Sequence, residues 1–126
     1  MGGTSRIDVA DWKAHTAYDG GYSATSAAVA HFWRAVEEMG DDDRGLLLKF
    51  ATGSAQPPLV GGFGALQGLG GPARFTLMKV EGGGGKLPTA ATCFCMLKLP
   101  AYGTFDEALA ALLIAARHGS EGFAFV

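Results

Sequence analysis

The stretch Thr92-Cys93-Phe94-Cys95-Met96-Leu97-Lys98-Leu99 decides how the rest of this chain is interpreted. Apolar residues dominate it, and we expect a strand over residues 92–99. Successive side chains of a strand point to opposite faces of the sheet. Strict alternation then predicts one face made of Cys93, Cys95, Leu97 and Leu99, and an opposite face made of Phe94, Met96 and Lys98.

The sequence on either side of this stretch predicts one further strand and three helices. Residues 74–80 resemble a strand, and a glycine-rich loop follows at residues 81–85. Residues 23–39 and 41–51 carry apolar residues at helical spacing, with Ser23 or Thr25 as the candidate cap of the first helix. Gly53 is placed to end the second helix. We expect loop from residue 57 to residue 71.

The last helix has the clearest signals. Thr104 and Glu107 form a capping box at its start, and Gly119 is the stop signal at its end. Its expected buried stripe consists of Leu109, Leu112, Leu113 and Ala116. Helices followed by a small sheet and one more helix predict an α/β (α+β) domain, in which a small β-sheet packs with several helices.

The composition limits the class of protein. Hydrophobic residues make up 48% of the 126 residues and charged residues 17%, which suits one compact domain and argues against disorder. The net charge of −2, without a basic block, argues against nucleic-acid binding. No apolar run reaches the roughly 18 residues of a membrane span, and no signal peptide is visible. We therefore expect no membrane partner and a location in the cytosol or nucleus.

The chain has two cysteines, Cys93 and Cys95. Residues two apart on an extended strand lie near the distance limit of a disulfide, so we expect two thiols. By composition alone Cys93 is a buried structural thiol, because free cysteine is often buried. For Cys95 we expect core packing, with a second reactive thiol or a Cys-x-Cys metal pair as alternatives. The three histidines are scattered, so we expect neither a metal nor a cofactor.

Several ordered motifs alter the interpretation of Cys93. In chain order they are Leu47-Leu48-Lys49-Phe50-Ala51-Thr52-Gly53, Pro57-Pro58, Gly62-Phe63, Arg74-Phe75, Leu87-Pro88-Thr89-Ala90-Ala91-Thr92-Cys93-Phe94, Leu97-Lys98-Leu99-Pro100-Ala101-Tyr102 and Glu121-Gly122-Phe123. With them the chain resembles the C-terminal lobe of HECT-type ubiquitin ligases, from about residue 7 to the end. The resemblance implies a lobe over residues 16–126. Residues 1–15 would be an arm or interlobe linker, of which 1–5 resemble vector residues.

The resemblance implies that Cys93 is the nucleophile that carries ubiquitin as a thioester. It also implies a set of supporting or ubiquitin-contacting residues: Leu87, Pro88, Ala91, Thr92, Phe94, Glu121 and Phe123. Backbone N–H groups at Cys93 and Phe94, with the Thr92 hydroxyl, are candidates for oxyanion stabilisation. Two positions depart from the family pattern, because Ala91 replaces a histidine and Cys95 replaces an asparagine. An alanine side chain has no polar atom with which to orient the site.

The partners implied by the resemblance are ubiquitin, a ubiquitin-conjugating enzyme and protein substrates. The conjugating enzyme would bind mainly through the family's larger N-terminal lobe, which these 126 residues do not contain. One alternative is a non-catalytic module, derived from this lobe, that binds ubiquitin or another partner. A thiol redox protein is a weaker alternative, because the usual Cys-x-x-Cys spacing is missing.

Overall fold

The structure is a computed structural model that describes residues 7–58, 62–68, 71–81 and 86–119. Its main sheet has four strands in the order β1 (Ala17–Asp19), β4 (Thr76–Val80), β6 (Met96–Pro100) and β5 (Thr89–Ala91). β4 runs parallel to both of its neighbours, whereas β5 and β6 form an antiparallel pair. A separate two-stranded sheet joins β2 (Gln67–Gly68) to β3 (Gly71–Pro72).

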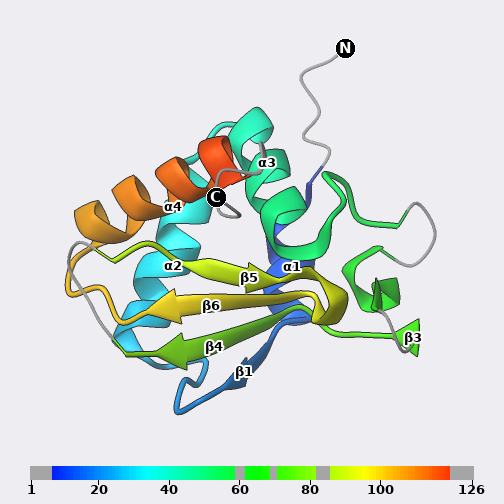
Figure 1. The fold of residues 1–126 in the computed structure, drawn as a ribbon, viewed down its shortest axis with the longest axis horizontal. Helices are drawn as coiled ribbons and strands as arrows, with labels where there is room; N and C mark the ends of the chain where they lie inside the picture. The colour runs from blue at the N-terminus through cyan, green and yellow to red at the C-terminus, as the bar shows by residue number, and fades with distance from the viewer. Residues whose placement is uncertain (1–6, 59–61, 69–70, 82–85, 120–126) are drawn as a thin grey trace.

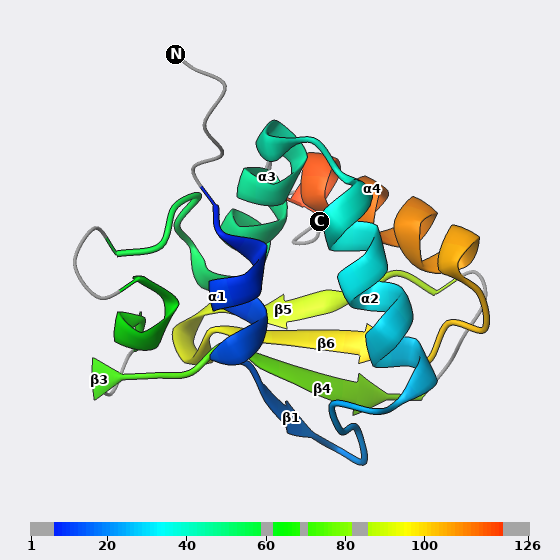
Figure 2. The same ribbon diagram turned by 180° about the vertical axis from the view of Figure 1, so that it is seen from behind.

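Four α-helices pack with the sheet: α1 (Val9–Ala14), α2 (Ala27–Glu38), α3 (Asp41–Thr52) and α4 (Phe105–Gly119). Figure 2 shows α1 and α2 over one face of the four-stranded sheet. In Figure 1, α3 and α4 lie beyond the β5 edge, where α3 contacts both β5 and β6. Two short 3-10 helices, η1 (Gly62–Ala65) and η2 (Thr92–Phe94), complete the described elements. The α/β prediction is confirmed.

The long helices begin and end close to the predicted positions. Gly53 adopts a left-handed conformation with φ of 88°, and its N–H donates to the Lys49 carbonyl, which ends α3 as predicted. Thr104 accepts a hydrogen bond from the Glu107 N–H at 3.1 Å, which confirms the cap of α4. The prediction that Ser23 or Thr25 caps α2 is wrong. Ser26 is the N-cap residue, and its side chain makes no capping hydrogen bond. Ser23 and Thr25 instead bond to each other in the preceding turn.

The N-terminal segment is part of the hydrophobic core. Asp8 caps α1 by accepting a hydrogen bond from the Asp11 N–H, and Trp12 is fully buried. The Trp12 ring stacks on Phe63 at 5.2 Å and meets the edge of Trp33 at 5.7 Å. The domain boundary at residue 15 stays a prediction, but Trp12, which precedes it, packs with Trp33 and Phe63, which follow it.

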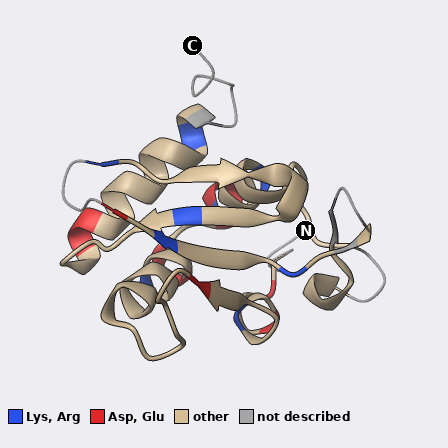
Figure 3. Ribbon diagram, turned by 60° about the horizontal axis from the view of Figure 1, so that its bottom comes forward, with Lys and Arg blue, Asp and Glu red and all other residues tan. Residues whose placement is uncertain are grey.

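Charged residues of both signs are distributed over the helices and strands (Figure 3). One exposed ion pair joins the last turn of α4 to the first turn of α3, where Arg117 donates two hydrogen bonds to the Asp43 carboxylate. This interaction holds the pKa of Asp43 below its usual value. Within the described ranges, no helix is long and apolar enough to cross a membrane.

Candidate active site at the tip of a hairpin

Cys93 lies at the tip of the β5–β6 hairpin. The last paired residues of the two strands are Ala91 and Met96, and η2 forms the turn between them. The Cys95 N–H donates to the Thr92 carbonyl at 3.2 Å and closes this turn. The predicted strand over residues 92–99 is therefore wrong in its first half, because the chain reverses direction here and β6 begins only at Met96.

Cys95 turns the chain back into the sheet. It has φ of 53° and ψ of 43° and is the one non-glycine residue with positive φ in the described ranges. Its carbonyl accepts a hydrogen bond from the Thr76 N–H at 3.0 Å, which attaches the turn to β4. The left-handed region is unfavourable for most side chains and is best tolerated by glycine, asparagine and aspartate. The asparagine that the family motif carries at this position suits that backbone, so Cys95 departs from the motif at a structurally demanding place.

The two thiols differ sharply in exposure. Cys93 is exposed, whereas Cys95 is 1% exposed and belongs to the hydrophobic core. Burial raises the pKa of the Cys95 thiol, which disfavours its reactive thiolate form. The predicted core position of Cys95 is confirmed, and the predicted shared face with Cys93 is wrong. The change from turn to strand between the two residues separates them.

The residues that flank Cys93 present few polar groups to it. Thr92 is exposed, with its carbonyl engaged by Cys95, and Ala91 offers only a methyl group beside Met96. Phe94 is 61% exposed, which is unusual for a large apolar side chain. The oxyanion role of this turn stays a prediction. Glu121 and Phe123, the other two predicted site residues, lie outside the described residues.

A groove lies at the opposite end of the hairpin from Cys93. It has a volume of about 250 Å³ and is lined by Lys86, Leu87, Tyr102, Glu107, Ala110, Ala111 and Ile114. Ile114 is 44% exposed, and Leu87 is half-buried. Pro88 follows Leu87 and is buried at the start of the path to β5. The sequence predicted Leu87 and Pro88 but missed Ile114, whose only signal was an apolar residue off the buried stripe of α4.

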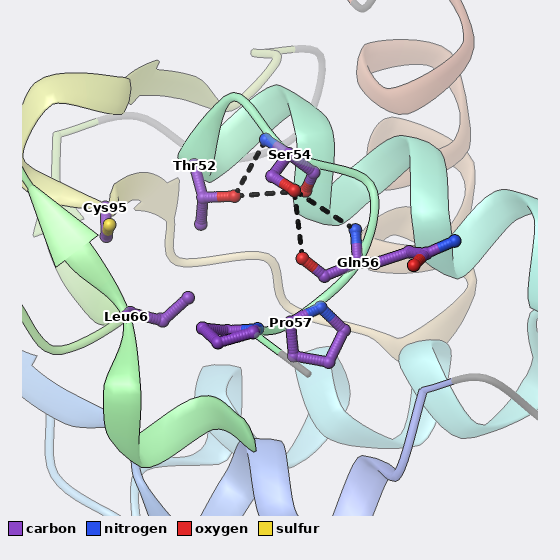
Figure 4. Close-up of a pocket in the computed structure, with 7 residues that line it drawn as sticks. Thr52, Ser54, Gln56, Pro57, Leu66 and Cys95 are labelled. Carbon is purple, nitrogen blue, oxygen red and sulfur yellow. Dashed lines mark hydrogen bonds between the residues drawn. The ribbon is translucent and has the colours of Figure 1, made fainter. Parts of the chain in front are cut away.

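A second hollow adjoins the hairpin tip. Its volume is about 400 Å³, and it is lined by Thr52, Ser54, Gln56, Pro57, Pro58, Leu66 and Cys95. Figure 4 shows the end of α3 on one side and Cys95 with Leu66 on the other. The polar groups bond to one another: the Thr52 hydroxyl donates to the Ser54 carbonyl at 3.1 Å, and the Ser54 hydroxyl to the Gln56 carbonyl at 2.9 Å. The lining residues carry no charge.

The described ranges contain no group of three or more histidine, cysteine, aspartate or glutamate side chains able to hold a metal ion. The features that remain are an exposed thiol on a hydrogen-bonded turn and a largely apolar groove at the other end of the same hairpin. Exposure and a fixed position are what a nucleophilic cysteine needs to reach a large partner.

Comparison with known proteins gives a consistent result. The chain is 43% identical over 125 residues to E3 ubiquitin-protein ligase ptr1 of Schizosaccharomyces pombe, covering 99% of this chain and 4% of that protein. It is 42% identical over 123 residues to E3 ubiquitin-protein ligase HACE1 of Danio rerio, covering 98% of this chain and 14% of that protein. It is 40% identical over 125 residues to E3 ubiquitin-protein ligase UPL1 of Arabidopsis thaliana, covering 99% of this chain and 3% of that protein.

The chain thus spans a small part of the length of these relatives. The family model for the HECT domain (ubiquitin-transferase) matches residues 1–126. This match confirms the resemblance that the ordered motifs carried. The chain belongs to the HECT-domain, ubiquitin-transferase family.

Proposed function

We propose that this chain is the catalytic lobe of a HECT-type ubiquitin ligase and that Cys93 carries ubiquitin as a thioester. The observation that carries the proposal is the placement of Cys93 as an exposed thiol at the tip of a hairpin. Cys95, two residues away, is buried and held in its protonated form. Only one of the two cysteines is therefore accessible to a protein-sized acyl donor.

The reaction has two acyl transfers. The Cys93 thiolate attacks the thioester between a conjugating enzyme and the C-terminal glycine of ubiquitin, and the cysteine of the conjugating enzyme leaves as a thiolate. A substrate lysine amine then attacks the new thioester, loses a proton, and forms an isopeptide bond while Cys93 leaves as a thiolate. The first transfer exchanges one thioester for another and is nearly balanced in free energy. Cysteine is intrinsically a strong nucleophile, so Ala91 is compatible with this step.

The groove supports a binding role for ubiquitin on the same lobe. Leu87 and Ile114 offer apolar surface there, and such surface marks interaction sites. Six residue steps lead from Leu87 to Cys93, which at about 3.3 Å per extended residue is a path of at most about 20 Å. We propose that the folded body of ubiquitin lies at the groove. Its C-terminal segment would then extend along β5 toward the thiol.

The partners follow from this reaction: ubiquitin, a loaded conjugating enzyme and protein substrates with an accessible lysine. We propose that the conjugating enzyme binds mainly to the larger lobe that this family carries, so the isolated chain should react in low yield. Glu121 stays a candidate for accepting the lysine proton. We propose a cytosolic or nuclear location, in keeping with two reduced thiols.

The test is formation of an adduct of one ubiquitin mass that a reducing agent removes, after mixing the chain with a ubiquitin-loaded conjugating enzyme. Wild type and Cys95→Ala should form the adduct, and Cys93→Ala should not. Cys95→Ala is the matched control because it removes a thiol from the same turn. An undiminished adduct in Cys93→Ala would overturn the assignment. Binding of ubiquitin without any adduct, also in the full-length ligase, would favour the non-catalytic module.

A further inference from the structure

The segment Lys86–Pro88 is attached to the core by Tyr102. The Tyr102 hydroxyl donates to the Lys86 carbonyl, and the side chain is 4% exposed. Lys86 follows four consecutive glycines, Gly82 to Gly85, in the sequence. The Lys86 side chain reaches back past them, because its Nζ donates to the Glu81 carbonyl at 2.9 Å. The Tyr102 hydrogen bond holds the backbone of Lys86, whereas the bond to Glu81 is made by its exposed side chain.

Tyr102 itself lies on a hydrogen-bonded turn between β6 and α4. Its N–H donates to the Pro100 carbonyl at 2.9 Å. The next residue, Gly103, donates its N–H to the Glu107 carboxylate at 3.1 Å, and the Glu107 N–H donates to the Thr104 hydroxyl at 3.1 Å. These reciprocal caps fix the start of α4 and with it the tyrosine backbone.

Tyr102 and Leu87 line the same groove as Ile114. We propose that Tyr102 is a positioning residue for ubiquitin transfer: it holds Lys86–Pro88 so that Leu87 forms one wall of the groove and the chain enters β5 in register. The inference rests on the proposed function, because the groove matters to the reaction only if ubiquitin binds there. Tyr102 need not touch ubiquitin or the reacting atoms.

Tyr22 provides a matched control. It is 8% exposed, and its hydroxyl donates to the Leu99 carbonyl at 2.8 Å. Burial is the main cause that raises the pKa of both tyrosines to about 12, and at Tyr102 the neighbouring Tyr22 and Glu107 raise the pKa further. The Tyr22 hydroxyl, however, bonds to β6 and not to the segment before β5. Replacing either residue with phenylalanine removes one buried hydrogen bond and keeps the ring.

The first test needs no ubiquitin. Amide hydrogen exchange in β5 (Thr89–Ala91) should be about threefold to tenfold faster in Tyr102→Phe than in wild type, the range that one net hydrogen bond gives. Tyr22→Phe should leave exchange in β5 within twofold of wild type. Equal exchange in the two variants would overturn the positioning role, whatever the reaction with ubiquitin shows.

The second test separates binding from chemistry. In thioester formation, Tyr102→Phe should raise the KM for the ubiquitin-loaded conjugating enzyme about threefold to tenfold and leave kcat within twofold. Tyr22→Phe should change neither. A wild-type chain that forms no thioester would refute the proposed function alone, since the exchange experiment still decides whether Tyr102 holds the segment. A wild-type chain that reacts, with Tyr102→Phe unchanged in KM, would overturn the inference alone.

Discussion

The two ends of the β5–β6 hairpin differ in the hollows beside them. At the tip, the cavity of about 400 Å³ is uncharged, and its hydroxyl groups at Thr52 and Ser54 are engaged in closing the end of α3. At the base, the groove of about 250 Å³ presents Leu87 and the half-exposed Ile114. Internal hydrogen bonds already engage the two hydroxyl groups at the tip, whereas apolar surface at the base gains by being covered. We therefore expect the smaller hollow to be the better recognition site.

Raising the pH should cause the largest loss in the free energy of unfolding. The pH at which the loss begins should differ between the two ends of the hairpin. The folded-state pKa of Tyr22 and of Tyr102 is about 12, above the ordinary value of 10.0, so the folded chain holds these protons longer than the unfolded chain. The contribution of these raised pKa values to the free energy of unfolding is complete below pH 10 and is lost as the pH rises toward 12. The loss amounts to about 2 to 3 kcal/mol for each tyrosine.

At the tip, the raised pKa of Cys95 places the corresponding loss above pH 9, its ordinary value. Urea unfolding at intervals from pH 7 to pH 12, with a reducing agent present, measures these losses. Tyr102→Phe should reduce the loss between pH 10 and pH 12, whereas Cys95→Ala should reduce the loss that begins near pH 9. A free energy of unfolding that stays constant to pH 12 would contradict both assignments.

Substitution at Ile114 is the direct test of the groove. Ile114→Gln removes an exposed apolar side chain but keeps a good helix former, so α4 should remain intact. We expect about a tenfold fall in the rate of thioester formation, which is the size of effect seen for a central interface residue. The matched variant at the tip is Gln56→Ala, which changes an exposed residue of the cavity and should stay within twofold. If the two variants reversed these effects, the recognition site would lie at the tip.

The smallest effect on stability should come from removing a hydroxyl group in the cavity at the hairpin tip. The Thr52 hydroxyl shares its one proton between the Leu48 carbonyl at 2.8 Å and the Ser54 carbonyl at 3.1 Å, and it accepts from the Ser54 N–H at 3.2 Å. Thr52→Val keeps the shape of the side chain and removes all of these hydrogen bonds, so it should lower the free energy of unfolding by about 1 kcal/mol. Urea unfolding measures the loss. The yield of the ubiquitin adduct should not change, and a large fall in that yield would give the cavity a role in transfer.

Much of the fold could be predicted from local signals. The capping box of α4 and the glycine that ends α3 act within a few residues, so their hydrogen bonds form wherever the helix forms. The sequence did not reveal α1 or β1. Each is short, and each forms because it packs against distant residues: Trp12 against Phe63, and Ala17 against Thr76 in the sheet. Segments of that length are not stable alone, so no local pattern predicts them.

The sequence by itself determined the family, the candidate nucleophile Cys93 and the residues around it, because ordered motifs and single side-chain chemistries can be recognised in one dimension. Only the tertiary structure decided that Cys93 is exposed while Cys95 is buried. The alternation of side chains along a strand ends where the backbone turns. The hydrogen bond from the Thr76 N–H in β4 to the Cys95 carbonyl attaches this turn to the sheet, and it joins residues 19 positions apart in the sequence. The groove likewise exists only after folding, since its walls at Leu87, Tyr102 and Ile114 come from three segments.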